Sequence, residues 1–169
     1  KVLEAISEKT KIIVLVNPNN PTGTSVNQSD IIKIIKKAKI NGALVLVDEA
    51  YYQFYGKTSI PLIKEYNNLF IIQTFSKAFG LAGLRLGYIA SNKNNIKIIQ
   101  KALSPYSVNS IAVVCASAAL KGLGYIKKYC AEVKRSKLIL YQELKRLGIE
   151  YCKSDANFVL LKIGSQSAK

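Results

Sequence analysis

The chain has 169 residues, 49% of them hydrophobic, which allows a substantial core and suits one domain or a piece of a larger one. Its formal net charge of +15 comes from 25 basic residues, and because nearly all are lysines spread over predicted helices without stacking aromatics, we expect solvated helix faces and no nucleic-acid partner. The longest apolar run, residues 111–120, is too short for a membrane span, and charges are mixed from Lys1 to Lys11, so we expect a cytoplasmic protein with no signal peptide and no membrane partner.

A strand, a helix and a second strand are predicted first. The apolar run Ile12–Val16 predicts a buried strand, and the next seven residues, Asn-Pro-Asn-Asn-Pro-Thr-Gly, predict a rigid loop. Asn27 or Ser29 can cap a helix that Asn41-Gly42 ends. Its apolar positions recur at helical spacing: Ile31, Ile34, Ile35 and Ala38. Residues 43–47 predict the next strand, which completes a right-handed βαβ unit with parallel strands.

Two further strands are expected before the middle of the chain. Residues 69–73 predict a third strand, and residues 51–68 are long enough for the crossover that leads to it. Residues 86–90 predict a fourth strand. Because the segment between the third and fourth strands is too short for the usual helical return, we expect the fourth to run antiparallel. The predicted fold class is therefore α/β, with a mostly parallel sheet, one antiparallel strand and flanking helices.

The pattern changes to helix after Asn92. Pro105 breaks the first helical segment, residues 111–120 predict a buried helix, and helical spacing continues to Leu147. Residues 148–149 and 157–163 return to a strand pattern. We therefore divide the chain into residues 1–128, part of a large domain, and residues 129–169, the truncated beginning of a smaller α+β domain.

Three predicted strand ends carry side chains with useful chemistry. Asn20, Asp48 and Lys77 follow the first, second and third strands. In an open, mostly parallel sheet, ligands bind beyond the carboxyl ends of the strands. We therefore expect these three residues to line one crevice.

Lys77 lies in a segment typical of a phosphate-binding turn. Residues 73–88 read Gln-Thr-Phe-Ser-Lys-Ala-Phe-Gly-Leu-Ala-Gly-Leu-Arg-Leu-Gly-Tyr, with hydroxyls before the lysine and glycines and an arginine after it. A lysine amine reacts with aldehydes when apolar or cationic neighbours favour its neutral form, as Phe75, Phe79 and Arg85 would. An aldehyde that also carries a phosphate is pyridoxal 5′-phosphate (PLP). We predict PLP as the cofactor and Lys77 as the catalytic residue.

The other candidates suit the remaining groups of PLP. A carboxylate beside the pyridine nitrogen keeps that nitrogen protonated, and Asp48 fits this role. The amide of Asn20 and the hydroxyl of Tyr51 can donate to the phenolic oxygen. Hydroxyls and a bidentate cation suit the phosphate, and these are supplied by Thr74, Ser76 and Arg85.

Each of these motifs has a simpler interpretation when it is taken alone. Asn-Pro-Thr-Gly is a turn, Asp48 a strand cap, and the Lys77 segment an exposed loop; their occurrence together and in this order favours a cofactor site. We interpret Tyr52, Phe54 and Tyr55 as packing residues. The chain has no His and three widely spaced cysteines, so we predict no metal site and reduced, buried thiols.

Three motifs carry a family resemblance: residues 19–23, residues 48–54 and residues 74–88. They resemble the fold-type I, class-II PLP-dependent aminotransferases, most closely those that act on histidinol phosphate. The resemblance implies that Lys77 binds the cofactor covalently and moves a proton during the reaction, and that Asp48 pairs with the pyridine nitrogen. It assigns the phenolic oxygen and the phosphate to Asn20, Tyr51, Thr74, Ser76 and Arg85. It further implies a homodimer that converts L-histidinol phosphate and 2-oxoglutarate into imidazole-acetol phosphate and L-glutamate.

The family pattern extends beyond this sequence. Nothing here matches the family's upstream phosphate-binding turn, its ring-stacking aromatic residue or the tyrosine lent to a neighbouring subunit. Neither Arg135 nor Arg146 stands in the motif of the arginine that binds the substrate. We therefore interpret the chain as part of one about twice as long. Three alternatives stay open: an aminotransferase for aromatic or other amino acids, a PLP-dependent phospho-amino-acid decarboxylase, and an aminotransferase-like regulatory sensor domain.

Overall fold

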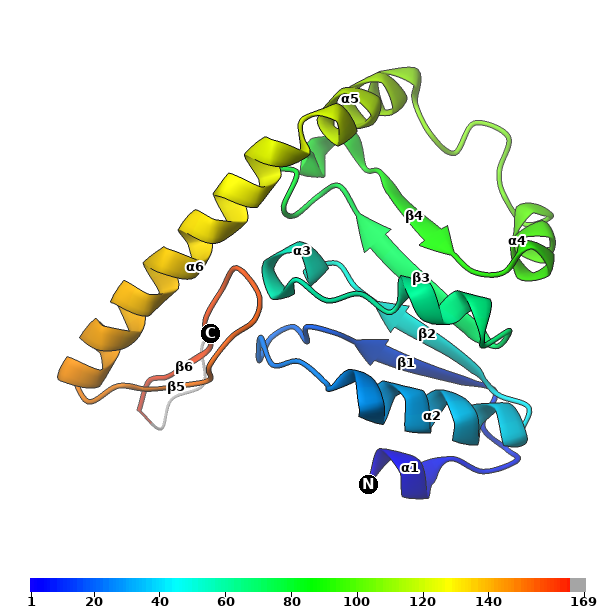
Figure 1. Ribbon diagram of the computed structural model, residues 1–169, viewed down its shortest axis with the longest axis horizontal. Helices are drawn as coiled ribbons and strands as arrows, with labels where there is room; N and C mark the ends of the chain where they lie inside the picture. Colours follow the sequence, from blue (N-terminus) through cyan, green and yellow to red (C-terminus); the bar gives the residue numbers. More distant parts are fainter. Residues whose placement is uncertain (165–169) are drawn as a thin grey trace.

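The computed structural model describes residues 1–164 and contains one four-stranded sheet in the order β1-β2-β3-β4 (Figure 1). The strands are β1 (Ile12–Val16), β2 (Leu44–Asp48), β3 (Leu69–Thr74) and β4 (Gly87–Ala90). β1, β2 and β3 are parallel, and β4 is antiparallel to β3. The predicted α/β fold class and the direction of the fourth strand are thus confirmed.

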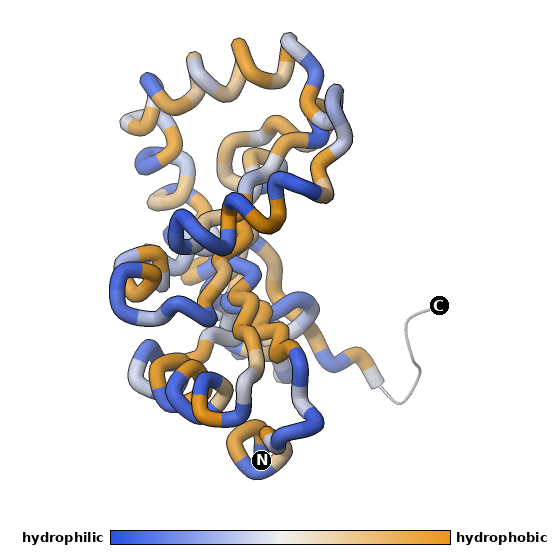
Figure 2. Tube along the Cα trace, turned by 90° about the vertical axis from the view of Figure 1, so that its right-hand side faces the viewer, coloured by the Kyte–Doolittle hydropathy of each residue, from blue (hydrophilic) through white to orange (hydrophobic). Residues whose placement is uncertain are grey.

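The main core lies between this sheet and the first two helices, α1 (Val2–Ala5) and α2 (Gln28–Ile40). Alternate strand residues point to one face, and on this face the valines of β2 and the apolar residues of β3 meet the apolar side of α2. Figure 2 shows apolar stretches through the centre of the molecule, with polar ones toward the outside. Ile35, at 0% exposure, is central, and truncating such a residue to Ala removes roughly 2–5 kcal/mol of stability.

Short helices connect the remaining strands. α3 (Tyr52–Tyr55) and the 3₁₀ helix η1 (Ile60–Lys64) lead from β2 to β3, and the 3₁₀ helix η2 (Ala82–Leu84) lies between β3 and β4. α4 (Lys93–Gln100) and α5 (Ser110–Lys121) follow. The side chain of Asn92 caps α4 by accepting hydrogen bonds from the backbone of Asn94 and Asn95.

A long helix, α6 (Leu123–Arg146), carries the chain to a separate two-stranded sheet of β5 (Glu150–Tyr151) and β6 (Leu161–Lys162). In Figure 1 the loop between β5 and β6 reaches back to the loop after β1 and to α3. The backbone amide of Asp155 donates to the carbonyl of Gly23 at 2.7 Å, which ties these two loops together. Tyr129, where we expected a smaller domain to begin, lies inside α6.

Several expectations for the second half of the chain were wrong in detail. The predicted helix at residues 111–120 is present as α5, but it is not buried: Ile111 is 69% and Val114 68% exposed, and only Ala112 and Ala116 are buried. Its small alanines face the rest of the molecule and its large side chains do not. Residues 157–163 form only the short β6, because residues 154–158 pack as a loop against the first half of the chain. The three cysteines are free but half-buried.

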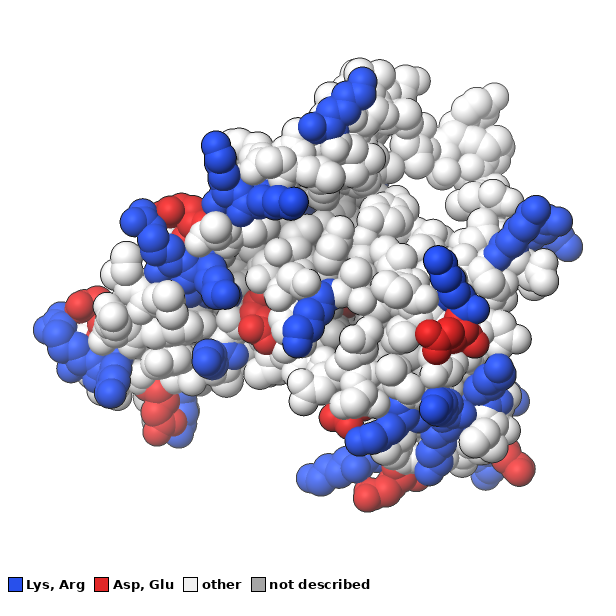
Figure 3. Space-filling view, viewed as in Figure 1, with Lys and Arg blue, Asp and Glu red and all other residues white. Residues whose placement is uncertain are grey.

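Charged residues lie mainly on the outer helices. On the face shown in Figure 3, the Lys and Arg side chains lie in several groups, mostly toward the edge of the molecule, with a dense group over α2. Among residues 1–164, no single helix has the length and composition of a membrane span, although α5 and α6, which meet at 77°, pass such a test as a bent pair.

Candidate functional site

The loop after β1 is held in shape by its own polar groups. Asn17 is 4% exposed, and its side-chain oxygen accepts a hydrogen bond from the amide of Val26 at 2.8 Å. The amide of Gly23 donates to the carbonyl of Asn19 at 2.7 Å. These bonds close the loop and leave the neighbouring Asn20 side chain exposed at its tip.

Asn20 and Tyr51 meet although 31 residues separate them. The Asn20 amide nitrogen donates to the Tyr51 hydroxyl at 3.2 Å. Tyr51 is 6% exposed and is the N-cap residue of α3, three residues after the end of β2. Two donors that share a location in this way can both turn to a single acceptor oxygen, as predicted for the phenolic oxygen of PLP.

Asp48 is the last residue of β2 and lies half-buried at the carboxyl end of the sheet. One of its carboxylate oxygens, Oδ1, accepts a hydrogen bond from the amide of Ala50 at 3.0 Å. The parallel register pairs Asp48 with Val16 and with Ile72. The sheet thus places this carboxylate beside the loop after β1 and close to the end of β3.

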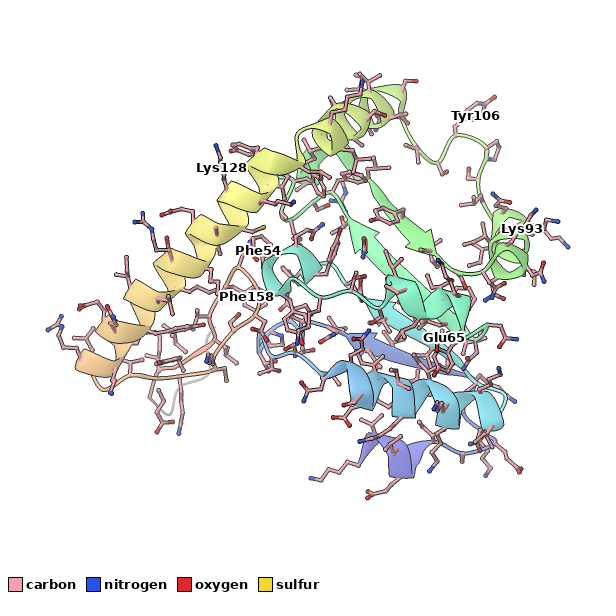
Figure 4. All side chains as sticks on the ribbon, in the orientation of Figure 1. Phe54, Glu65, Lys93, Tyr106, Lys128 and Phe158 are labelled. Atoms are coloured by element: carbon pink, nitrogen blue, oxygen red, sulfur yellow. The ribbon has the colours of Figure 1, made fainter. Side chains whose placement is uncertain are left out.

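Lys77 lies over the ring of Tyr51. Its Nζ atom is 5.4 Å from the ring centroid, and the residue is exposed. The Tyr51 ring is supported from another side by Phe158, whose ring meets it edge-on with centroids 5.2 Å apart and an interplanar angle of 82°. Figure 4 shows Phe158 on the loop between β5 and β6, beside α3. The amine is therefore held at a strand end by an aromatic pair drawn from both halves of the chain.

The predicted phosphate-binding residues are only partly gathered. The Thr74 hydroxyl donates to the Ser76 hydroxyl at 3.0 Å and accepts from the Ser76 amide at 3.0 Å. Arg85 is exposed, has a φ of 52°, and its guanidinium donates to the carbonyl of Ala82 at 3.0 Å. Within residues 1–164, no hydrogen bond joins Arg85 to Thr74 or Ser76. The two hydroxyls therefore form one cluster, and the arginine stands in the adjoining turn.

The neighbours expected around Lys77 are arranged differently. Phe75 and Phe79 pack on each other with ring centroids 4.9 Å apart, and Phe75 also lies 6.0 Å from the Tyr88 ring. Phe54, predicted as a packing residue, contacts the Tyr129 ring of α6 at 6.0 Å. Tyr51 is thus the aromatic residue that the structure records against the amine of Lys77.

Sequence reasoning missed two groups of residues near the site. Phe158 was interpreted only as part of a strand, and Glu49 and Gln73, both 1% exposed, were not singled out. For Glu49, the available signal was its position directly after Asp48, which was already a predicted site residue. No local signal pointed to Phe158, because its contact with Tyr51 spans more than a hundred residues.

This arrangement combines a carboxylate, two hydrogen-bond donors, a pair of hydroxyls and an exposed amine at the ends of three strands. The amine suits an aldehyde, the hydroxyls suit a phosphate, and the carboxylate suits a protonated ring nitrogen. The donor set therefore fits PLP. Within residues 1–164, no three His, Cys, Asp or Glu side chains lie close enough together to hold a metal ion.

Comparisons with known proteins give a consistent result. The family model described as aminotransferase class I and II matches residues 1–169. The chain is 44% identical over 163 residues to a histidinol-phosphate aminotransferase of Thermoanaerobacter pseudethanolicus, a match that covers 96% of this chain and 45% of that protein. The chain thus spans less than half the length of this relative.

Solved structures agree with that similarity. A putative histidinol-phosphate aminotransferase from Erwinia carotovora atroseptica superimposes with a TM-score of 0.86 and 29% identity over 96% of this chain and 48% of that chain. The histidinol-phosphate aminotransferase from Sinorhizobium meliloti, solved in complex with PLP, superimposes with a TM-score of 0.82 and 27% identity. The match covers 91% of this chain and 42% of that chain. L-threonine-O-3-phosphate decarboxylase from Porphyromonas gingivalis superimposes with a TM-score of 0.82 and 26% identity. The match covers 97% of this chain and 52% of that chain.

Proposed function

We propose, because this chain belongs to the aminotransferase class I and II family, that the whole protein is a PLP-dependent histidinol-phosphate aminotransferase. It would transfer an amino group from L-histidinol phosphate to 2-oxoglutarate and form imidazole-acetol phosphate and L-glutamate. The observation that supports PLP chemistry is the contact of Lys77 with Tyr51 and of Tyr51 with Asn20, at the end of the sheet where β2 ends in Asp48. The choice of substrate rests on the 44% identity to a relative of that name.

Bound PLP supplies an electron sink that stabilises negative charge on the substrate carbon. Asp48 holds a proton on the ring nitrogen by charge pairing, and Asn20 and Tyr51 orient the ring by donating to its phenolic oxygen. Thr74, Ser76 and Arg85 bind the phosphate. The amine of Lys77 would hold the cofactor through its aldehyde carbon, with loss of water, and would carry a proton to and from the reacting carbon of the substrate.

The organisation of the whole protein follows from the same proposal. Residues 1–128 belong to the large, cofactor-binding domain, and residues 129–169 begin a smaller domain, of which residues 165–169 lie outside the described part. We propose a cytoplasmic homodimer whose partners are the amino donor and the 2-oxo acid, with no role for nucleic acid or a membrane. The match to the Thermoanaerobacter pseudethanolicus relative covers 45% of that protein, which supports a longer polypeptide.

The decisive test uses the full-length protein with PLP. Borohydride reduction followed by peptide mapping is expected to place a pyridoxyl group on Lys77. Lys77→Ala should retain PLP without a covalent link and lose turnover by several orders of magnitude. A label on another lysine, or no label, would contradict the assignment of cofactor and catalytic residue.

A phospho-amino-acid decarboxylase is the second candidate, because the Porphyromonas gingivalis enzyme shares the fold at a TM-score of 0.82. An aminotransferase returns glutamate from 2-oxoglutarate, whereas a decarboxylase releases carbon dioxide. A panel of amino donors, histidinol phosphate and aromatic amino acids included, assayed for both products separates these activities. A regulatory sensor would bind PLP and give neither product.

A further inference from the structure

A second group of polar side chains lies behind the proposed cofactor site. Gln73 lies in β3, and Glu49 follows β2 directly, with its amide bonded to the carbonyl of Ile72 in β3. Because side chains alternate between the two faces along this extended backbone, both point away from the face that carries their chain neighbours Asp48 and Thr74. Both are 1% exposed. They continue the buried apolar rows of β2 and β3, and the core therefore ends in polar groups just below the site.

These polar groups are fully paired with one another. The Glu49 carboxylate accepts from the Ser59 amide at 2.6 Å, the Thr58 hydroxyl at 2.5 Å and the side-chain amide of Gln73 at 2.8 Å. The side-chain oxygen of Gln73 accepts from the hydroxyl of Tyr88 in β4. The chain of bonds joins β2, β3, β4 and the segment before η1. A buried network that is satisfied in this way holds one geometry, because any other leaves a polar group unpaired.

Tyr88 and Tyr52 extend the network toward α3. Burial, then the neighbouring Tyr52 phenol and the Glu49 carboxylate, raise the pKa of Tyr88 to about 12. The pKa of Tyr52 is also raised, mainly by burial. Both phenols are therefore protonated at physiological pH, and Tyr88 remains a donor to Gln73.

The network and the proposed cofactor contacts are adjacent in the chain at three points. Glu49 follows Asp48, Gln73 precedes Thr74, and Tyr52 follows Tyr51. We propose that Glu49, Gln73 and Tyr88 are positioning residues that fix the backbone from which Asp48, Tyr51 and Thr74 reach PLP. This inference rests on the proposed function for its ligand. The backbone geometry around Asp48, Tyr51 and Thr74 can be measured in the protein without PLP.

Two backbone amides report on that geometry directly. The amide of Ala50 donates to the Asp48 carboxylate, and the amide of Ser76 donates to the Thr74 hydroxyl, both at 3.0 Å. In cofactor-free, full-length protein, Glu49→Gln places a side-chain amide that donates hydrogen bonds against groups that also donate, among them the side-chain amide of Gln73. The substitution should therefore speed hydrogen exchange at the amides of Ala50 and Ser76 at least about tenfold. The amide of Val45, which bonds the carbonyl of Asn68 in the core, should be unchanged.

A matched control and a milder variant are available in the same chain. Glu65→Gln makes the same chemical change at an exposed position (Figure 4) and should leave exchange at both amides unaltered. If Glu49→Gln does not fold, Tyr88→Phe removes only one hydroxyl and should speed exchange at Ser76. The inference is overturned if Glu49→Gln folds and exchange at Ala50 and Ser76 is unchanged. If Glu49→Gln does not fold, unchanged exchange at Ser76 in Tyr88→Phe overturns it.

The effect on the ligand is measured as the dissociation constant of PLP by equilibrium dialysis. Glu49→Gln should raise it at least about tenfold in folded protein, and Glu65→Gln should not. Exchanging the two residues in Glu49→Gln/Gln73→Glu restores complementary donors and acceptors and should recover most of the affinity. A purely structural role would lower the unfolding temperature and leave PLP affinity of the folded protein unchanged. If the parent protein does not bind PLP, the proposed function fails and the exchange rates alone decide the inference.

Discussion

At the scale of single residues, the site depends on side chains that each have more than one partner. Tyr51 contacts Asn20 through its hydroxyl, Lys77 through its ring face and Phe158 in a T-shaped ring pair. A buried tyrosine with a polar tip suits such a place, because its ring packs while its hydroxyl stays bonded. The position of the Lys77 amine is thus set by an aromatic residue that the second half of the chain supports.

Asp48→Asn tests the role of the carboxylate with little change in shape. The asparagine keeps an oxygen that can accept from the Ala50 amide, so the strand end should remain intact. A carboxylate beside a ring nitrogen favours its protonated form by about 1–3 pKa units, and the loss should slow transamination roughly 10- to 1,000-fold. PLP affinity should change far less. Near-normal turnover of the purified variant would show that the carboxylate is only a strand cap.

Arg85→Lys tests whether a guanidinium holds the phosphate. Arg85 is one of few arginines in a lysine-rich chain, and its planar group can bind two phosphate oxygens where an ammonium binds as a point charge. We expect PLP retention to weaken by roughly 1–3 kcal/mol, measured as PLP release during dialysis.

The control for Arg85 changes charge on the far helix. Lys36 and Lys37 lie on α2. Changing both to Gln in one protein should leave PLP release unchanged. Equal loss from the two proteins would mean that general positive charge, and not Arg85, retains the phosphate.

At the scale of elements, the loop after β1 is where the two halves of the chain meet. Asp155 bonds the carbonyl of Gly23 through its amide, and its carboxylate accepts from the hydroxyl of Ser25. On the other side of the β5–β6 loop, the ammonium of Lys137 in α6 donates to the carbonyls of Ser154 at 2.7 Å and Ala156 at 2.5 Å. The β5–β6 loop is thus clamped between α6 and the segment that carries Asn20.

Gly23→Ala should weaken this contact. Gly23 has a φ of +71°, and an added Cβ would lie 2.1 Å from the Ser154 hydroxyl oxygen. The backbone conformation alone disfavours Ala by about 1–2 kcal/mol, and the overlap adds to it. Gly56→Ala, with a φ of +83° and open space around it, carries only the backbone effect. Denaturant unfolding of full-length protein should show the larger loss for Gly23→Ala, and equal losses would contradict this account.

At the scale of the whole molecule, stability and site geometry share the buried network beneath the sheet end. The ordinary pKa of a tyrosine is 10.0, and burial raises that of Tyr88 to about 12. Between these values the unfolded chain has released a proton that the native state still holds. Stability therefore falls as the pH rises through this window.

The expected result is a steeper alkaline loss of stability for the parent than for Tyr88→Phe. Below pH 10 the difference between the two proteins should be constant, and from pH 10 to 12 it should shrink. Because Tyr88 is 43% exposed, solvent weakens the effect. Urea unfolding midpoints from pH 9 to 12 measure it, and parallel curves would show that Tyr88 titrates as a free tyrosine.

The sequence by itself determined the positions of the four main strands along the chain and the direction of the fourth, since these follow from local apolar runs, turn residues and connection lengths. It also determined which residue types stand at the strand ends, and the structure brings Asn20, Tyr51 and Lys77 into contact there. Only the tertiary structure decided that Phe158 supports Tyr51, that Asp155 docks on Gly23 and that Glu49 binds Gln73. It also decided that the large side chains of α5 are exposed. Local periodicity states which side of an element is apolar, whereas contacts between segments distant in sequence depend on how the whole chain packs, and no local pattern records that.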